Sequence, residues 1–373
     1  MDKYKNIDIV YTHFPHYRLP VFSALSKSNS YKFKFFFDKK LNMSGIKQGL
    51  ASGEIDCCDI KTYQFMKIMF QPYAIYHSLN TKSDMVVYLG NPFIVSNWVA
   101  MIILRLRKKH IMLWTHGWIK KDKFPMSTIR NYFYLLSNGL LLYGKNAYKI
   151  GISNGFSKNF MHIIYNSLDY ESQKSALHFS RVDKVKYSYS KKPSYFLVVG
   201  RLVNSLEIDI LIDALIISKK EIIVKIVGDG PEKNRLKKRV QVKGLPVEFL
   251  GPIYDEKHLC KLFIDAIAVI SPGKVGLLAM HALVYGTPVI THSNKYAQMP
   301  EFEALDPEVT GFFFDYKCAD DLCRVINEVN SYMDIPQNRN KTANRALNTI
   351  EERYTPLKQV EFIEKALSSV MSN

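Results

Sequence analysis

Residues 266–292 read AIAVISPGKVGLLAMHALVYGTPVITH and indicate a strand, a glycine-containing loop, a helix and a second strand. The apolar run Ile267–Ile270 is typical of a parallel strand that is buried on both faces. A helix is expected over about 277–285, with Gly286 as its left-handed C-terminal cap. Because the first turn of a helix has unpaired N–H groups that attract anions, the stretch predicts a phosphate site beside Gly276. Many such units bind no ligand, so other segments must support the prediction.

Short apolar segments alternate with helical stretches along the whole chain, which predicts an α/β fold with doubly wound parallel sheets. Since 373 residues exceed one ordinary core, two domains with a cleft between them are expected. We expect an N-terminal domain over 1–170, a linker rich in Ser, Lys and Tyr over 171–193, a C-terminal domain over 194–354 and a C-terminal helix over 355–373. The predicted strands are 7–12, 32–37, 85–89, 110–115, 139–143, 149–152, 195–199, 222–227, 247–250, 267–270 and 289–291.

The composition, 47% hydrophobic and 23% charged, is that of a globular protein. We expect no signal peptide, because Met1–Lys5 leads directly into a predicted strand, and no apolar run reaches the length of a membrane span. The five cysteines follow neither a metal-binding nor a disulfide pattern, which fits a reducing cytosol.

The positive charge is concentrated in the first half of the chain. Residues 1–190 contain 27 Lys and Arg against 11 Asp and Glu, whereas the remainder contains 24 against 23. The basic residues are interleaved with apolar ones in Tyr31–Lys40, Tyr63–Phe70 and Leu104–His110. This pattern favours an anionic membrane surface or a phosphorylated acceptor as partner. Nucleic acid would rest on charge alone and is not expected, and solvated surface lysines are the simpler alternative.

A series of short motifs follows in a fixed order: Gly200-Arg201-Leu202, Gly228-Asp229-Gly230-Pro231-Glu232, Phe249-Leu250-Gly251, Ser271-Pro272, Gly276-Leu277, Gly286-Thr287-Pro288-Val289, Pro300-Glu301 and Thr310-Gly311. This order resembles the nucleotide-sugar glycosyltransferases of family four, which have the GT-B architecture. Phe14–Pro20, Trp114–Trp118 and Ile164–Asp169 are similar to segments of its polysaccharide-building members. The resemblance implies two Rossmann-like domains facing a central cleft, with the acceptor bound by the first domain and the donor by the second.

The resemblance also implies the donor-site residues. Arg201 follows the strand 195–199 and would hold the diphosphate as a bidentate cation, with a catalytic role in stabilising the leaving group; a surface salt bridge is the alternative. Gly228-Asp229-Gly230 would form a tight turn beside the base, in which Asp229 may serve the turn alone. The expected donor-binding residues are Gly200, Arg201, Gly228, Asp229, Lys274, Val275, Gly276, Leu277, His281, Glu301 and Glu303. No metal and no cofactor are expected, because there is no Asp-x-Asp cluster.

Three positions depart from the family pattern. Leu206 stands where the family commonly has Lys, and Gly273 and His281 stand where it has two glutamates. His281 could bond the ribose hydroxyls, or it could be satisfied by packing within its helix. Lys274 could replace the missing cation. Glu301 and Glu303, expected to alternate on an extended segment, could take over hydroxyl recognition, or could cap a surface turn.

In the first domain the resemblance directs His116 at the transferred sugar, as a hydrogen-bonding or proton-tuning catalytic group at the cleft rim. Its neighbours Trp114 and Trp118 offer faces for sugar stacking, although a core histidine packed between two tryptophans is the rival interpretation. His16 and Arg18 follow the first strand, and both are expected to bind the acceptor.

We therefore expect a hexosyltransferase that moves a hexose from a nucleoside-diphosphate sugar to a surface-glycan acceptor carried on lipid, with retention, at the inner face of the cell membrane. Capsule and lipopolysaccharide synthesis are the processes implied. The alternatives are a degenerate GT-B module that binds without turnover and a nucleotide-sugar epimerase.

Overall fold

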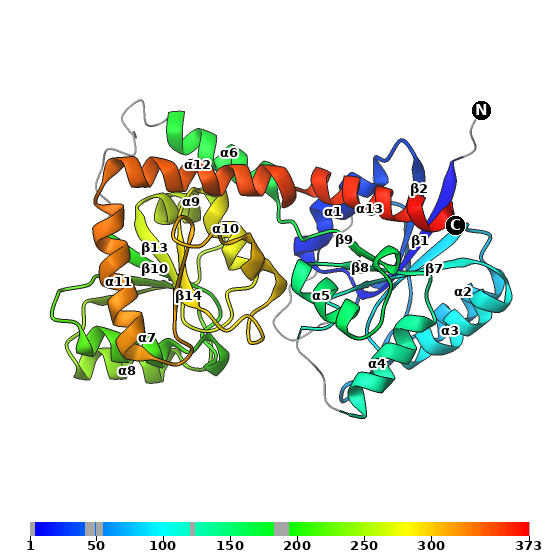
Figure 1. Cartoon of the computed structure of the whole chain (residues 1–373), viewed down its shortest axis with the longest axis horizontal. Helices are drawn as coiled ribbons and strands as arrows, with labels where there is room; N and C mark the ends of the chain where they lie inside the picture. Colours follow the sequence, from blue (N-terminus) through cyan, green and yellow to red (C-terminus); the bar gives the residue numbers. More distant parts are fainter. Residues whose placement is uncertain (1–3, 42–48, 50–54, 120–123, 183–193, 373) are drawn as a thin grey trace. The chain divides into compact units, whose positions relative to one another are not determined.

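The computed structural model describes residues 4–41, 49, 55–119, 124–182 and 194–372, and it divides into two compact units (Figure 1). Unit 1 comprises Met1–Asp169 and Thr355–Asn373, and unit 2 comprises Tyr170–Tyr354. The C-terminal helix α13 (Pro356–Met371) is therefore part of unit 1.

Unit 1 is built on a parallel sheet whose order, over the described residues, is β3-β2-β1-β6-β7-β8-β9. Its strands are nearly continuous apolar runs because both faces of the sheet are covered by helices. The strands are β1 (Lys5–His13), β2 (Tyr31–Asp38), β3 (Cys57–Asp59), β6 (Met85–Leu89), β7 (His110–Thr115), β8 (Gly139–Leu142) and β9 (Met161–Ile163).

Two hydrophobic clusters cover the faces of this sheet. Ile9 and Trp114 pack with α1 (Leu19–Ser26) and α13 on one face. Val10 and Leu113 pack on the other face with the helices α2 (Pro72–Asn80), α3 (Val95–Leu106), α4 (Met126–Leu135) and α5 (Lys145–Ser153). An antiparallel hairpin, β4 (Tyr63–Phe65) and β5 (Ile68–Phe70), precedes α2.

Unit 2 has a second parallel sheet, ordered β12-β11-β10-β13-β14-β15 over the described residues. Its strands are β10 (Tyr195–Val199), β11 (Val224–Val227), β12 (Val247–Gly251), β13 (Ala266–Ser271), β14 (Val289–His292) and β15 (Gly311–Phe314). Its helices are α6 (Tyr170–Val182), α7 (Ile208–Ile217), α8 (Lys233–Val242), α9 (Glu256–Ile264), α10 (Leu278–Val284), α11 (Ala319–Met333) and α12 (Pro336–Arg353). Two sheets of this kind confirm the predicted α/β, Rossmann-like class.

The helix α10 ends as its sequence predicts. Gly286 has φ +76°, and its N–H donates to Leu283 O at 3.0 Å. The next N–H, of Thr287, donates to Ala282 O at 3.1 Å. These two bonds form a Schellman motif, which requires a left-handed residue and therefore favours glycine.

All but one of the predicted strands are present. The strand predicted at 149–152 is wrong, because these residues lie in α5, whose buried residues Ala147, Ile150 and Gly151 have helical spacing. The predicted linker 171–193 is also wrong in its first part, where residues 171–182 belong to α6; its amphipathic pattern packs this helix on α9. Residues 183–193 lie outside the described residues. Within the described residues no helix is long and apolar enough to cross a membrane.

Candidate functional site

The second sheet changes direction between β10 and β13. The chain runs outward from β10 through β11 to β12 and then returns to β13, which pairs with the other side of β10. Ligands of doubly wound sheets bind beyond the carboxyl ends of the strands at such a point. The residues that follow these two strands are Gly200 and Arg201 after β10, and Pro272–Leu277 after β13.

The loop between β13 and α10 presents backbone N–H groups at this switch point. Gly276 has φ +49°, and Val275 N–H donates to the side-chain oxygen of Gln298 at 2.9 Å. Within the described chain, the N–H groups of Gly276 and Leu277 donate to no protein acceptor. This is the donor arrangement that an anion requires.

Two cations follow the strands of the switch point, Arg201 after β10 and Lys274 after β13. Arg201 and Lys274 are both exposed, and neither forms an ion pair within the described ranges. The interpretation of Arg201 as half of a surface salt bridge therefore finds no partner in that part of the chain. An exposed guanidinium at the end of β10 is able to make two parallel hydrogen bonds to a phosphate.

The glycines of two motifs allow loops to touch. A Cβ at Gly228 would overlap the carbonyl oxygen of Gly200, and a Cβ at Gly230 would overlap that of Leu202. Asp229 serves the same turn, because its carboxylate accepts from Gly230 N–H at 2.8 Å and pairs with Lys233 at 3.1 Å. The pKa of Asp229 is lowered by these contacts. The structure thus assigns Asp229 to the turn.

The departures at Gly273 and Leu206 are packed against each other. Gly273 N–H donates to Leu206 O at 3.1 Å, and a Cβ at Gly273 would overlap the Ser205 carbonyl oxygen. Leu206 packs against the core of unit 2. A glutamate at 273 is therefore incompatible with this loop conformation. At position 206, where the family commonly has Lys, this chain has a packing side chain.

His281 has a partner inside unit 2. Its Nε2 lies 2.7 Å from Glu256 Oε1, which also accepts from the hydroxyl of Tyr285, and its ring packs on Phe263 with centroids 4.7 Å apart. Burial opposes ionisation of Glu256, but the hydrogen bonds from His281 and Tyr285 and the charge of His281 together outweigh it, so the pKa of Glu256 is lowered. Of the two interpretations of His281, the packing one matches these contacts.

Glu301 and Glu303 lie on a 3₁₀ helix, Pro300–Ala304, and the expected extended segment is wrong. Glu301 is 3% exposed and Glu303 is half-buried. Residues two apart on a 3₁₀ helix point in different directions, so the two carboxylates do not share a face. Burial also excludes a surface turn for Glu301.

Gln298 and His292 position the loop between β13 and α10, and neither residue was expected from the sequence. The Gln298 amide accepts from Val275 N–H and donates to Thr291 Oγ1 at 2.9 Å, which connects the end of β14 to the loop after β13. His292 lies 3.2 Å from the same amide, and burial lowers its pKa to about 4. No sequence signal marks these residues, because their partners lie on other elements.

In unit 1, His116 follows β7 and lies beside Arg18. Burial, with a smaller contribution from Arg18, lowers the pKa of His116 to about 4, so the ring is neutral near pH 7. Its Nδ1 is buried and has no hydrogen-bond partner among the described residues. The ring packs on Tyr143, with centroids 4.6 Å apart. A neutral imidazole has one donor and one acceptor nitrogen, so it can donate a hydrogen bond to a sugar hydroxyl or accept one from it.

The predicted stacking role of Trp114 and Trp118 is wrong. Their exposed fractions are 0% and 1%, so neither indole face can reach a sugar. Trp114, on β7, belongs to one core cluster, and Trp118, beyond the end of this strand, belongs to the other. The rival interpretation, a core histidine packed between two tryptophans, matches the burial of both indole rings.

The two predicted acceptor residues of the first loop differ in exposure. His16 is exposed, whereas Arg18 is 4% exposed and lies 5.0 Å from the Trp114 ring and 4.9 Å from the Tyr143 ring. Arg18 donates to the Tyr143 hydroxyl. Its positive charge also lowers the pKa of nearby His13, after burial as the main cause. Arg18 thus places a buried positive charge near His13 and His116.

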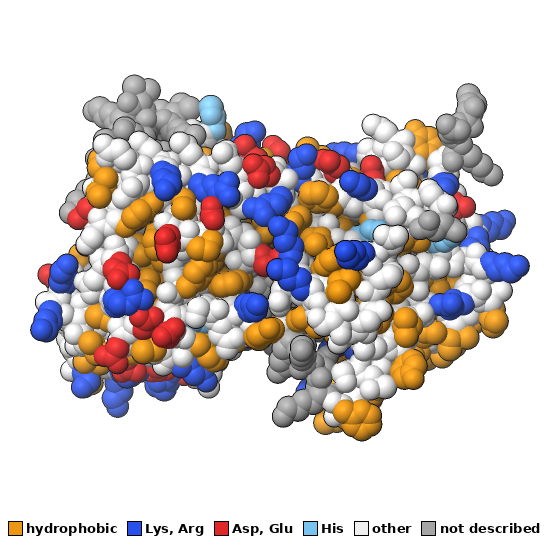
Figure 2. Space-filling model, in the orientation of Figure 1, with side chains coloured by type: hydrophobic (Ala, Val, Ile, Leu, Met, Phe, Trp, Pro, Cys, Tyr) orange, Lys and Arg blue, Asp and Glu red, His pale blue; other side chains and the backbone are white. Residues whose placement is uncertain are grey.

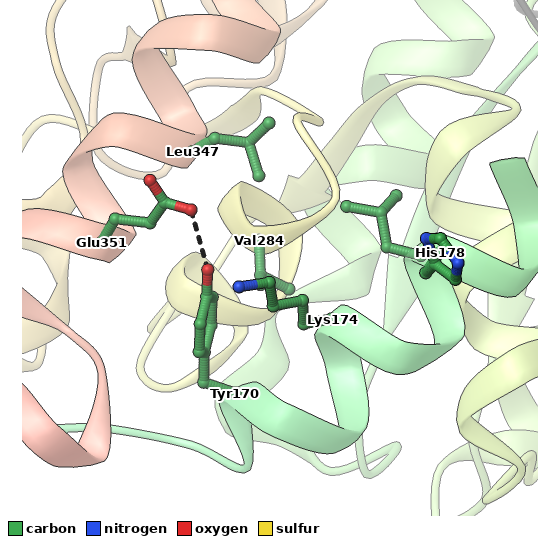
Figure 3. Close-up of a pocket in the computed structure, with 7 residues that line it drawn as sticks. Tyr170, Lys174, His178, Val284, Leu347 and Glu351 are labelled. Carbon is green, nitrogen blue, oxygen red and sulfur yellow. Dashed lines mark hydrogen bonds between the residues drawn. The ribbon is translucent and has the colours of Figure 1, made fainter.

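Figure 3 shows a pocket of 190 Å³ on unit 2 that is separate from the switch point. The Tyr170 hydroxyl donates a hydrogen bond to Glu351 Oε1 at 2.8 Å across this pocket. Val284, at the last turn of α10, contributes to the wall, whereas the N–H groups of Gly276 and Leu277 precede the first turn. The remaining lining residues are Lys174, Leu177, His178 and Leu347.

Residues 180–348 match the family described as glycosyl transferases group 1. This match covers most of unit 2 and less than half of the chain. The matched segment contains the motifs from Gly200 to Gly311, and it confirms the resemblance to the family-four nucleotide-sugar glycosyltransferases.

The whole chain shares its fold with solved glycosyltransferase structures. The lipopolysaccharide outer core galactosyltransferase WaaB in its apo form has a TM-score of 0.71 and 18% identity, covering 98% of this chain and 99% of its own. Anabaena Alr3699/HepE in complex with UDP has a TM-score of 0.71 and 16% identity, covering 98% and 100%. These likenesses confirm the GT-B fold class.

A curated relative is an uncharacterized 41.2 kDa protein in the cps region of Klebsiella pneumoniae. It is 24% identical over 185 residues, 48% of this chain and 48% of the relative. The match thus spans about half the length of that relative.

Proposed function

We propose that this chain is a nucleotide-sugar-dependent glycosyltransferase that moves a hexose to a lipid-linked surface-glycan acceptor. The observation that carries the proposal is the coincidence of the group 1 match, residues 180–348, with a sheet switch point. This point bears Arg201 and the N–H groups of Gly276 and Leu277, which have no acceptor in the described chain. The solved relative bound to UDP supports a uridine nucleotide as the first donor to test.

The donor diphosphate would bind at the N–H groups of Gly276 and Leu277, with Arg201 and Lys274 neutralising its charge. Stabilising the charge on the departing diphosphate is the main demand of the reaction. These groups would supply that stabilisation without a metal ion. Retention at the anomeric carbon remains part of the proposal.

His116 would bond a hydroxyl of the transferred sugar in its neutral form. The acceptor is proposed from the relatives, one located in a cps region and one named as a lipopolysaccharide galactosyltransferase. A lipid-linked acceptor would require unit 1 to work at the inner membrane surface. The excess of Lys and Arg in residues 1–190 supports that location.

Arg201→Gln tests the donor site. Loss of a charge-assisted bond of about 1.5–3 kcal/mol should weaken UDP binding about tenfold to a hundredfold, measured by titration calorimetry. The matched control is Arg324→Gln, an exposed arginine of α11 that pairs with Asp321 and Glu328 and should bind UDP as the wild type does. Equal affinity of Arg201→Gln and wild type would contradict the proposed site.

A second candidate is a binding module without turnover, favoured by the packing of Gly273 against Ser205, which excludes the family carboxylate from that position. Incubation with a panel of nucleotide sugars and a membrane extract separates the two. A transferase releases nucleoside diphosphate only when an acceptor is present. A binding module releases none although it binds the nucleotide, and an epimerase converts the donor without any acceptor.

A further inference from the structure

The helix α3 is apolar on its outer side as well as on its inner side. Val95, Val99, Ile102 and Leu106 follow the spacing of one helix face, and they are between 41% and 80% exposed. The polar residue Ser96 is instead fully buried. A helix that is apolar all round is normally enclosed, so the outer side of α3 has the composition of a buried surface.

The neighbouring helices extend this surface. Tyr76 and Leu79 on α2 are 61% and 55% exposed, and Tyr132 and Leu135 on α4 are 64% and 54% exposed. Contacts fix these helices beside α3. Arg107, which follows α3, donates to Ser78 O within α2 at 2.6 Å and to Thr81 O just after α2 at 2.9 Å. Arg105 of α3 donates to Leu135 O at 2.9 Å.

The hairpin β4–β5 adds a fourth element. Its cross-strand pairs Tyr63 with Phe70 and Phe65 with Ile68 lie on one side of the hairpin, and all four side chains are exposed. Met69 lies on the other side, buried, and bridges to Ile94 at the start of α3. We call the outer sides of α2, α3, α4 and this hairpin the α2–α4 face. Figure 2 shows hydrophobic side chains gathered over α3 and α4.

This face is also strongly basic. The described residues 60–119 and 124–135 contain eight Lys and Arg but only one acidic residue, Asp84. Lys67 at the hairpin turn, Lys82 after α2, and Arg105 and Lys108 at the end of α3 are exposed. Pairing of two copies through this face would bring like charges together, which opposes self-association.

Unit 2 provides an internal comparison. More than half of the exposed large apolar side chains of the described chain lie between residues 63 and 135 of unit 1, whereas those of unit 2 are dispersed. Apolar patches of this extent on a soluble protein mark interaction sites, while single exposed residues need no explanation. The α2–α4 face is therefore a distinct surface.

We propose that the α2–α4 face docks on an anionic lipid bilayer. Its aromatic and aliphatic side chains would enter the boundary between head groups and acyl chains, while the lysines and arginines at its rim contact lipid phosphates. A bilayer offers apolar depth and negative charge together, which matches both properties of the face. The inference rests on the proposed function in one respect, since docking here would bring unit 1 to a lipid-linked acceptor.

The predicted basic segments are only partly involved. Tyr63–Phe70 and Leu104–His110 contribute to the face, as the interleaved pattern favours. Tyr31–Lys40 does not, because β2 is a strand of the sheet with Phe33, Phe35, Phe36 and Phe37 buried. In β2, Phe33 and Phe35 are buried on one face of the sheet, whereas Lys34 between them is partly exposed on the other face.

The test is co-sedimentation of the full chain with vesicles of equal parts phosphatidylglycerol and phosphatidylcholine. The wild type should bind these vesicles at least about tenfold more tightly than phosphatidylcholine alone, because binding needs charge as well as apolar contact. The double variant Ile102→Gln, Leu106→Gln should bind the anionic vesicles at least about tenfold more weakly than the wild type. Both positions are exposed, so the fold should be retained and UDP binding unchanged.

The matched control is Ile217→Gln, Ile223→Gln, which changes two residues of unit 2 that are 44% and 45% exposed. This control should bind vesicles as the wild type does. Two results would overturn the docking proposal: equal vesicle binding by wild type and the α3 variant, or a dimer in sedimentation velocity that the α3 variant abolishes while no vesicles are bound. Failure of every variant to bind UDP would instead defeat the proposed function and leave the vesicle result standing.

Discussion

At the residue scale, the conformation of the loop between β13 and α10 depends on the lack of a side chain at Gly273. The N–H of Gly273 donates to Leu206 O at 3.1 Å, and the Leu206 side chain packs against the core of unit 2. The loops after β10 and β13 are therefore fixed to each other. This contact holds Arg201 on one side of the switch point and Gly276 on the other.

Gly273→Ala should destabilise unit 2, because the new Cβ would overlap the Ser205 carbonyl oxygen, a backbone atom that cannot move alone. The expected loss is about 1–3 kcal/mol in the free energy of unfolding, the usual cost of overpacking, together with weaker UDP binding. Urea unfolding followed by circular dichroism measures it. The neighbouring exposed Lys274→Ala is the control and should leave stability unchanged; an equally stable Gly273→Ala would show that the loop adapts freely.

Single residues of the site were predicted unevenly, for a physical reason. Arg201 and Gly276 follow strand ends, so the order of the strands alone places them at the switch point. The partner of His281, Glu256, lies on another helix, and no local pattern announces that contact. Trp114 was expected to be accessible, although it lies on β7, a strand that is buried on both faces.

At the scale of elements, the strands of both sheets were predictable because each is a short apolar run covered on both faces. The failures are short or mixed segments. The strand β15, Gly311–Phe314, pairs only with β14 at the edge of the described sheet. Residues 149–152 alternate locally, but the spacing of Ala147, Ile150 and Gly151 determines the outcome. The return of α13 to unit 1 depends on contacts far apart in sequence.

Gln359 is one such contact and gives a prediction for α13. It is fully buried; its Oε1 accepts from the Ser167 hydroxyl at 2.7 Å and its Nε2 donates to Tyr165 O at 2.7 Å. Gln359→Leu removes both bonds and should lower the free energy of unfolding of unit 1 by about 2 kcal/mol.

Tryptophan fluorescence measures this loss selectively, because Trp98, Trp114 and Trp118 all belong to unit 1. The exposed Lys365→Leu, on the same helix, is the control and should unfold at the wild-type urea concentration. If Gln359→Leu also did so, the two buried bonds would make no net contribution to the attachment of α13.

At the scale of the whole molecule, the two units differ in surface chemistry. The α2–α4 face belongs to unit 1, which contains 25 Lys and Arg against 11 Asp and Glu, whereas unit 2 contains 26 against 23. A donor nucleotide needs only a local cluster of cations and N–H groups. A membrane surface needs a broad basic and apolar area, so the two proposals place donor binding on unit 2 and membrane docking on unit 1.

Both units nevertheless share one response to acid. Burial lowers the pKa of His13 and His116 in unit 1 and of His292 in unit 2, with His116 and His292 at about 4. The pKa of a histidine in the unfolded chain is about 6.5. Between these pH values the unfolded chain binds protons that the folded chain does not. Stability is therefore complete above about pH 6.5 and decreases as the pH falls toward about 4.

His292→Gln isolates this effect in unit 2, because His292 is 1% exposed and burial alone accounts for its lowered pKa. In the wild type this one group should cost roughly 3 kcal/mol of the free energy of unfolding between about pH 7 and about pH 4. Urea unfolding followed by circular dichroism at the two pH values should show a correspondingly smaller loss for His292→Gln. The exposed His258→Gln should retain the wild-type loss. A wild-type pH dependence in His292→Gln would mean that another group controls the acid sensitivity of unit 2.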